Sequence, residues 1–160
     1  MENIVMCIGN EDNGDDGIGP YIAKRLKDEN LKDFLILDCG TVPENFTSPV
    51  KKNSPVNLII VDATEMGLSP GEIRRIPREM IAKMHISTHN IPISVLVSYL
   101  ESHAKNIIII GVQPKKMTGS MSEEIRRSCE KLIDLIKNKK FSEIEMLKIE
   151  KKSKKINLLL

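Results

Sequence analysis

The chain has 160 residues, a length that fits one domain with a real hydrophobic core. Its 24 Lys and Arg nearly balance its 22 Asp and Glu, and a net charge of +2 gives no electrostatic reason to expect nucleic acid or a membrane as partner. Cys7, Cys39 and Cys129 lie far apart without a CxxC pair, which argues against a disulfide framework and a cysteine zinc site. The N-terminus lacks the pattern of a signal peptide, and no apolar run approaches the ~20 residues that span a bilayer. We therefore expect a cytoplasmic protein without membrane insertion.

Apolar, β-branched runs alternate along the chain with helical patterns. The runs show little polar alternation, which favours strands buried on both faces of a parallel sheet. We expect such strands at 3–8, 34–37, 58–61 and 107–112. Amphipathic spacing predicts helices at 18–26, 93–100 and 125–136, the last of them with a capping box of Ser120 and Glu123. This order predicts a three-layer α/β/α domain.

Two further segments differ from this pattern. Residues 71–77, GEIRRIP, alternate apolar and charged side chains between prolines, which indicates an edge strand. From Lys139 onward the sequence is rich in lysine and ends in an apolar stretch. We therefore place the domain at 1–138 and treat 139–160 as a tail of unknown order.

A loop with four glycines and four acidic residues follows the first expected strand. Its sequence is GNEDNGDDGIGP, residues 9–20, and the spacing from Gly9 to Gly14 matches a phosphate-binding loop. That motif needs Lys and Ser or Thr where this chain has Asp15 and Asp16, whose charges would repel a phosphate. The loop also lacks GxGxxG, so neither a nucleotide nor a dinucleotide site is expected.

Asp16, Asp62 and His89 each have an ordinary explanation when taken alone. An Asp at a helix start is a favoured cap, an Asp after a buried strand can cap a turn, and a lone loop histidine is more often a surface residue than a ligand. Asp62 ends the apolar run IIVD, and His89 lies in ISTHNIPIS, just before the helix that Pro92 opens.

Taken together, the three residues indicate a common site. Ligands of open α/β sheets bind at the carboxyl ends of the strands, where these loops converge. Two carboxylates and one imidazole suit a first-row divalent metal with open positions for substrate or water. No Ser, Cys or Thr stands out beside a base, and HExxH is absent, so hydrolysis would use water rather than an acyl-enzyme. Chemistry alone thus predicts a metal site of unspecified purpose.

Five segments resemble the hydrogenase maturation protease family, and within it the hydrogenase-3 type. They are GNEDNGDDGIGP at 9–20, DCGTVPEN at 38–45, IIVDATEMGLSPGEIRRI at 59–76, STHNIPIS at 87–94 and IIGVQP at 109–114. They occur in the family's order and cover nearly everything up to residue 137. The segment KKMTGSMSEE after GVQP and the Lys-rich tail depart from the family pattern.

The resemblance implies an endopeptidase that removes the C-terminal extension of a nickel-iron hydrogenase large-subunit precursor after nickel insertion. It also implies a twisted, mostly parallel five-stranded mixed sheet between helices, in which GEIRRIP is the expected antiparallel edge strand. Metal-binding and catalytic roles carry over to Asp16, Asp62 and His89, with the adjacent Asp15 as an outer-shell partner.

In the resembled family these residues are thought to recognise nickel already present in the substrate. The nickel then arrives with the precursor, so we expect a resting enzyme without a tightly bound metal. We also expect a monomer. The resemblance does not choose between an aspartic-type and a metal-assisted reaction.

Two alternatives from other classes stay open on the sequence. A phosphoacceptor signalling domain also pairs acidic residues after its first strand with an Asp that ends its third, but it needs a Lys where this chain has Gln113 and Pro114. A nickel-site chaperone would keep the fold and bind the precursor without cutting it.

Overall fold

The computed structural model describes residues 1–84 and 91–148, and five segments of this part form one mixed sheet in the order β2-β1-β3-β5-β4. The neighbours from β2 to β5 pair in parallel, and β4 pairs antiparallel with β5 at one edge. The strands are β1 (Asn3–Ile8), β2 (Phe34–Gly40), β3 (Asn57–Ala63), β4 (Ile73–Arg75) and β5 (Asn106–Val112). The predicted fold class is confirmed, including the antiparallel edge strand within GEIRRIP.

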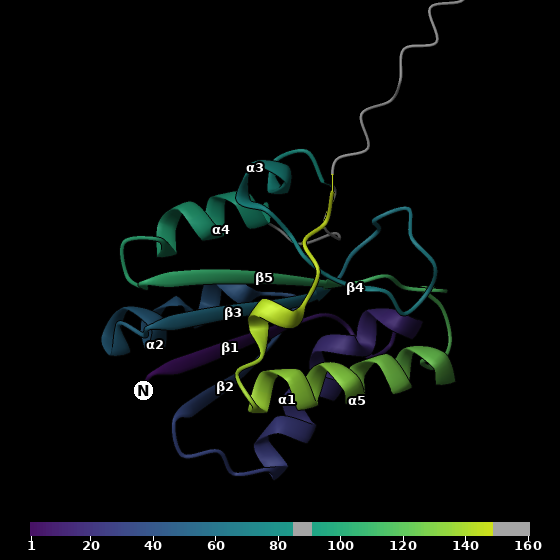
Figure 1. The fold of residues 1–160 in the computed structure, drawn as a ribbon, viewed down its shortest axis with the longest axis horizontal. Coiled ribbons are helices and arrows are strands. Elements are labelled where there is room, and N and C mark those ends of the chain that lie inside the picture. Colours follow the sequence, from purple (N-terminus) through teal and green to yellow (C-terminus); the bar gives the residue numbers. More distant parts are fainter. Residues whose placement is uncertain (85–90, 149–160) are drawn as a thin grey trace, which may run out of the picture.

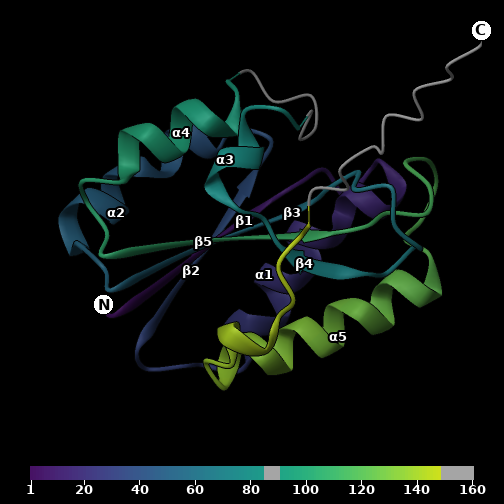
Figure 2. The same ribbon diagram turned by 45° about the horizontal axis from the view of Figure 1, so that its top comes forward.

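Helices cover both faces of this sheet (Figure 1). On one face lie α1 (Ile18–Asp28) and α5 (Glu123–Lys137), and on the other lie α2 (Thr47–Asn53), α3 (Arg78–Ile81) and α4 (Ile93–Leu100). Figure 2 shows the same two helical layers after rotation. Each face has its own apolar core, because the strands are buried on both sides. No helix within 1–84 or 91–148 is both long enough and apolar enough to cross a bilayer.

The sequence did not predict α2 and α3, which are short and carry little amphipathic signal. The predicted capping box of α5 is wrong. The helix begins at Glu123 with Ser122 as its N-cap, and the hydroxyl of Ser122 makes no capping bond. It donates instead to the carboxylate of Asp15, 3.1 Å away, so a long-range contact replaces the local one.

Residues 139–148, drawn in yellow in Figure 1, pack against the sheet and α5. They include the short 3-10 turn η3 (Phe141–Glu143), and the side chains of Phe141, Ile144 and Leu147 are buried. The outer edge of β4 takes this segment as a partner: Arg75 N donates to Glu145 O at 2.9 Å, and Leu147 N donates to Arg75 O at 2.8 Å. The first part of the Lys-rich segment thus covers an otherwise open sheet edge. The remainder, 149–160, lies outside the described residues.

The start of α1 lies against the backbone of β1. A Cβ on Gly19 would stand 2.1 Å from the carbonyl oxygen of Ile8, which no real side chain tolerates. Glycine at this position therefore allows the helix to approach the strand end closely. The approach fixes where the loop between β1 and α1, and with it Asp16, meets the sheet.

The loop after β1 is fastened to the loop between β5 and α5 through Asp15. This side chain is fully buried, and its carboxylate accepts hydrogen bonds from the backbone N–H groups of Lys115, Lys116 and Ser122 at 2.7–2.9 Å, besides the Ser122 hydroxyl. Burial alone raises the pKa of Asp15, but the four donors together outweigh it and hold the pKa below its ordinary value. Asp15 is therefore a charged clamp between two loops at the carboxyl edge.

We expect Gly19→Ala to destabilise the protein by about 3 kcal/mol, because the added methyl group collides with β1. At an ordinary helical position a Gly→Ala change stabilises a protein by up to about 1 kcal/mol. A lower free energy of unfolding for Gly19→Ala would therefore indicate the collision with β1. Urea unfolding measures the difference. Gly67→Ala is the control: no atom lies within 4 Å of its Cβ, and only the left-handed backbone at φ +69° opposes it. Equal costs for the two variants would contradict the collision.

We expect Asp15→Asn to lower the free energy of unfolding by about 3 kcal/mol at neutral pH, because charge-assisted bonds to buried donors are lost. A carboxyl group whose pKa is lower in the folded protein than in the unfolded chain, where it is about 3.9, stabilises the fold at pH values above about 3.9. This stabilisation is lost as the pH falls through the pKa of the folded state. The difference in free energy of unfolding between wild type and Asp15→Asn, measured by urea unfolding, should therefore become smaller below about pH 4. Asp28→Asn, at the exposed end of α1, should show no such gap.

Candidate functional site

The carboxyl ends of β1 and β3 form a topological switch point. The chain leaves β1 through α1 toward β2 and leaves β3 toward β4 on the other side of the sheet. Loops that diverge in this way leave a crevice, where open α/β sheets bind their ligands. Both predicted aspartates lie here.

Asp16 belongs to η1 (Gly14–Gly17), the 3-10 turn that leads into α1. Its side chain is 5% exposed, and its Oδ2 accepts a hydrogen bond from the backbone N–H of Asn10 at 3.0 Å. A buried carboxylate is costly unless donors or cations compensate its charge. The turn therefore presents a carboxyl oxygen acceptor within a mostly buried setting.

Asp62 is the next-to-last residue of β3 and is 3% exposed. The pairing of Asp62 with Gly111 of β5 fixes its place in the sheet, and η1 packs against β3. Two buried carboxylates thus come from elements in contact with each other. Neither Asp16 nor Asp62 is without a partner in the structure.

His89 lies outside the described residues, within 85–90. The described chain stops at Met84 after α3 and resumes at Ile91 before α4. Within the described part no group of three or more His, Cys, Asp or Glu side chains could hold a metal ion. The site composed of Asp16, Asp62 and His89 therefore stays a prediction.

Asp38 is a carboxylate at this edge that the sequence reasoning did not single out. It lies near the end of β2, is exposed, and lines a hollow of about 320 Å³ together with Gly9, Asn10 and Thr41. The sequence could have indicated Asp38, because DCGT directly follows the apolar run of the second expected strand. A polar side chain at that position belongs to the same sheet edge as Asp16 and Asp62.

The three thiols are buried and free. Burial raises the pKa of Cys7 well above its ordinary value and the pKa of Cys39 and Cys129 to about 12. A thiol in such a setting is protonated at neutral pH and is a poor nucleophile. The structure thus supports the expectation that no cysteine forms an acyl-enzyme.

Gln113 and Lys115 oppose the phosphoacceptor alternative. Gln113, one residue beyond β5, is 3% exposed, and its amide is engaged with the segment that follows β3. The amine of Lys115 lies 2.6 Å from the carboxylate of Glu124 in α5. No lysine ends the last core strand to take the role that a phosphoacceptor domain requires.

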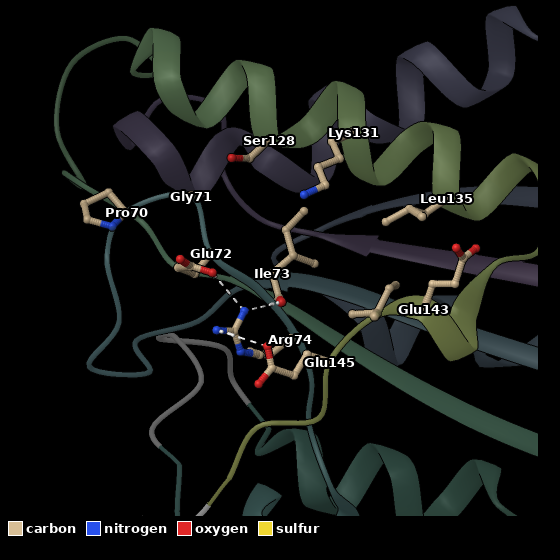
Figure 3. Close-up of a pocket in the computed structure, with 11 residues that line it drawn as sticks. Pro70, Gly71, Glu72, Ile73, Arg74, Ser128, Lys131, Leu135, Glu143 and Glu145 are labelled. Carbon is tan, nitrogen blue, oxygen red and sulfur yellow. Dashed lines mark hydrogen bonds and ion pairs between the residues drawn. The ribbon is translucent and has the colours of Figure 1, made fainter.

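Two larger hollows lie beside β4. A methionine-lined groove of about 540 Å³ lies between the segment after β3, α3 with the turn that follows it, and the last described residues of the chain. Its apolar lining consists of Met66, Leu68, Met80, Met84, Met146 and Leu147. The other hollow, of about 430 Å³, lies between β4, α5 and η3 (Figure 3). Arg74 lines both hollows, and its guanidinium bonds to Glu72 at 2.9 Å and lies 3.6 Å from Glu145. The methionine-lined groove shares its wall with the segment that follows Asp62.

Known proteins match this chain in sequence and in fold. The hydrogenase maturation protease (HycI) profile matches residues 20–139. The hydrogenase 3 maturation protease of Escherichia coli K12 is 39% identical over 115 residues, 71% of this chain and 74% of that protein. The solution structure of the endopeptidase HycI from Escherichia coli matches with a TM-score of 0.86 at 32% identity, over 94% of this chain and 99% of that one. The [NiFe] hydrogenase maturation protease HycI of Thermococcus kodakarensis has a TM-score of 0.76 at 31% identity, over 86% and 90%. With the profile over most of the domain and a common fold, the chain belongs to the hydrogenase maturation protease family.

Proposed function

We propose that this protein is the endopeptidase that removes the C-terminal extension of a nickel-iron hydrogenase large-subunit precursor after nickel has been inserted. The observation that carries the proposal is the pair of buried carboxylates, Asp16 and Asp62, on contacting elements at the switch point of a maturation-protease fold. Buried carboxylates at a ligand crevice are costly, and binding a cation is one function that offsets such a cost.

Nickel in this proposal belongs to the substrate. Asp16, Asp62 and His89 offer two oxygen ligands and one nitrogen ligand to the nickel of the precursor, a set that suits a first-row divalent ion. The resting enzyme then needs no tightly bound metal. It works as a monomer in the cytoplasm.

The cut itself uses water. A carboxylate of the pair takes a proton from the attacking water, or the metal of the precursor polarises the scissile carbonyl, and both routes leave a free C-terminus on the large subunit. The raised pKa of each buried thiol supports a reaction without a cysteine nucleophile.

The decisive experiment incubates the protein with nickel-loaded and with nickel-free precursor and measures the precursor's mass. We expect loss of a C-terminal peptide from the nickel-loaded form only. An intact precursor that stays bound would favour the chaperone alternative, and cutting of both forms would refute recognition through nickel.

Asp16→Asn, Asp62→Asn and His89→Ala should each reduce processing at least about 100-fold, because each removes one ligand of the substrate's metal. Asp28→Asn, the same chemical change at an exposed position of α1, should process normally. Circular dichroism and thermal unfolding check that each variant is folded. Normal processing by any of the three site variants removes that residue from the site.

A further inference from the structure

The segment Glu65–Leu68 is held by a single buried side chain. Oε1 of Gln113 accepts hydrogen bonds from the backbone N–H groups of Met66, at 2.7 Å, and Leu68, at 3.3 Å. Nε2 of the same amide donates to Oε2 of Glu65 at 2.9 Å and to the carbonyl of Pro114 at 3.3 Å. At 3% exposure, this amide uses its whole hydrogen-bonding capacity on loop positions.

The backbone of Gln113 continues the same attachment. Gly71 N donates to Gln113 O at 2.8 Å, and Gln113 N donates to Glu72 O at 2.9 Å. The connection between β3 and β4 is thus fastened near both of its ends to one residue beyond β5. Glu65 and Gly67 are themselves exposed, so the bonds to Gln113 are what attaches this part of the connection to the buried part of the domain.

The held segment has a place in the proposed reaction. Glu65 follows Asp62 by three residues, a span of about 10 Å in extended chain. Met66 and Leu68 form one wall of the methionine-lined groove. A peptide held with its scissile bond at Asp62 therefore reaches this wall within about three residues. Methionine side chains adapt to varied apolar partners, and a wall fixed beforehand lowers the entropic cost of binding.

We propose that Gln113 is a positioning residue for precursor processing: it fixes Glu65–Leu68 as the wall that receives the precursor's peptide chain beside the scissile bond. This role rests on the proposed function. Gln113 acts through the segment it holds, so its loss weakens precursor binding and leaves the chemical step intact.

Gln113→Glu tests this role with almost no change in shape. The carboxylate still accepts from Met66 and Leu68, but its second oxygen faces the carboxylate of Glu65 and repels it. We expect KM for the nickel-loaded precursor to rise about ten-fold while kcat changes little, because uniform binding is lost. The double variant Gln113→Glu with Glu65→Gln restores a donor opposite the new carboxylate, and KM should return close to the wild-type value.

Asn57→Asp is the matched control at the opposite end of the sheet. Asn57 links β1, β3 and β5, since it donates to Asn3 at 2.9 Å and accepts from Asn106 at 3.1 Å. The same amide-to-carboxylate change should lower stability without changing KM. A rise in KM equal to that of Gln113→Glu would show that KM follows general stability and would overturn the role of Gln113.

Amide hydrogen exchange of the wild-type protein tests the same role without any substitution. The N–H groups of Met66 and Leu68 should exchange slowly, and fast exchange at both would overturn the proposal. A wild type that leaves the precursor intact refutes the proposed function. A wild type that cuts, together with an unchanged KM for Gln113→Glu or a double variant that is not rescued, refutes only the role of Gln113.

Discussion

The carboxylate of Asp15 is the interaction on which the arrangement of the site depends. It lies between the loop after β1 and the loop before α5 and binds three backbone N–H groups and one hydroxyl. Asp15 N also donates to Lys116 O at 2.9 Å, and Gly14 N donates to Gly119 O at 2.9 Å, so the two loops are joined by backbone bonds as well. Because Asp16 is the next residue, the direction of its side chain follows from this clamp. A carboxylate buried for a structural reason thus orients the neighbouring residue, Asp16, of the proposed site.

The segment that follows β5 acts as a common anchor. Its first residue, Gln113, holds the connection after β3, and its later residues, Lys115 to Ser122, hold the loop after β1. The loop that contains Asp16 and the connection that follows Asp62 are therefore tied to the same stretch of chain. This arrangement explains how long connections at the carboxyl edge keep a defined geometry although they contain little regular structure. It also gives a structural reason for the GVQP segment in the family resemblance.

Hydrophobic periodicity was sufficient to predict most of the fold. The continuous apolar runs gave β1, β2, β3 and β5, because strands buried on both faces need no polar alternation. The alternation within GEIRRIP gave β4, an edge strand whose three side chains are half-buried. The periodicity gave no signal for α2 and α3, which are too short for it. The capping box of Ser120 and Glu123 was wrong because α5 begins at Glu123, so that Ser122 is its N-cap, and Ser122 bonds to Asp15, 107 positions away. Asp38 was missed because a single exposed carboxylate after a strand has many ordinary explanations.

The sequence by itself determined the layers, the alternation of the main strands and helices along the chain, the family resemblance, and the choice of Asp16, Asp62 and His89. These properties follow from local periodicity and from motifs, which are written in neighbouring residues. Only the tertiary structure gave Asp15 the role of a clamp between two loops and placed Asp16 in a turn that contacts β3, the strand of Asp62. Only the tertiary structure also placed Gln113 against Glu65 and the C-terminal residues against β4. The partners in those contacts are about 50 to 100 residues apart, and hydrogen bonds between distant segments leave no periodic trace in a single sequence.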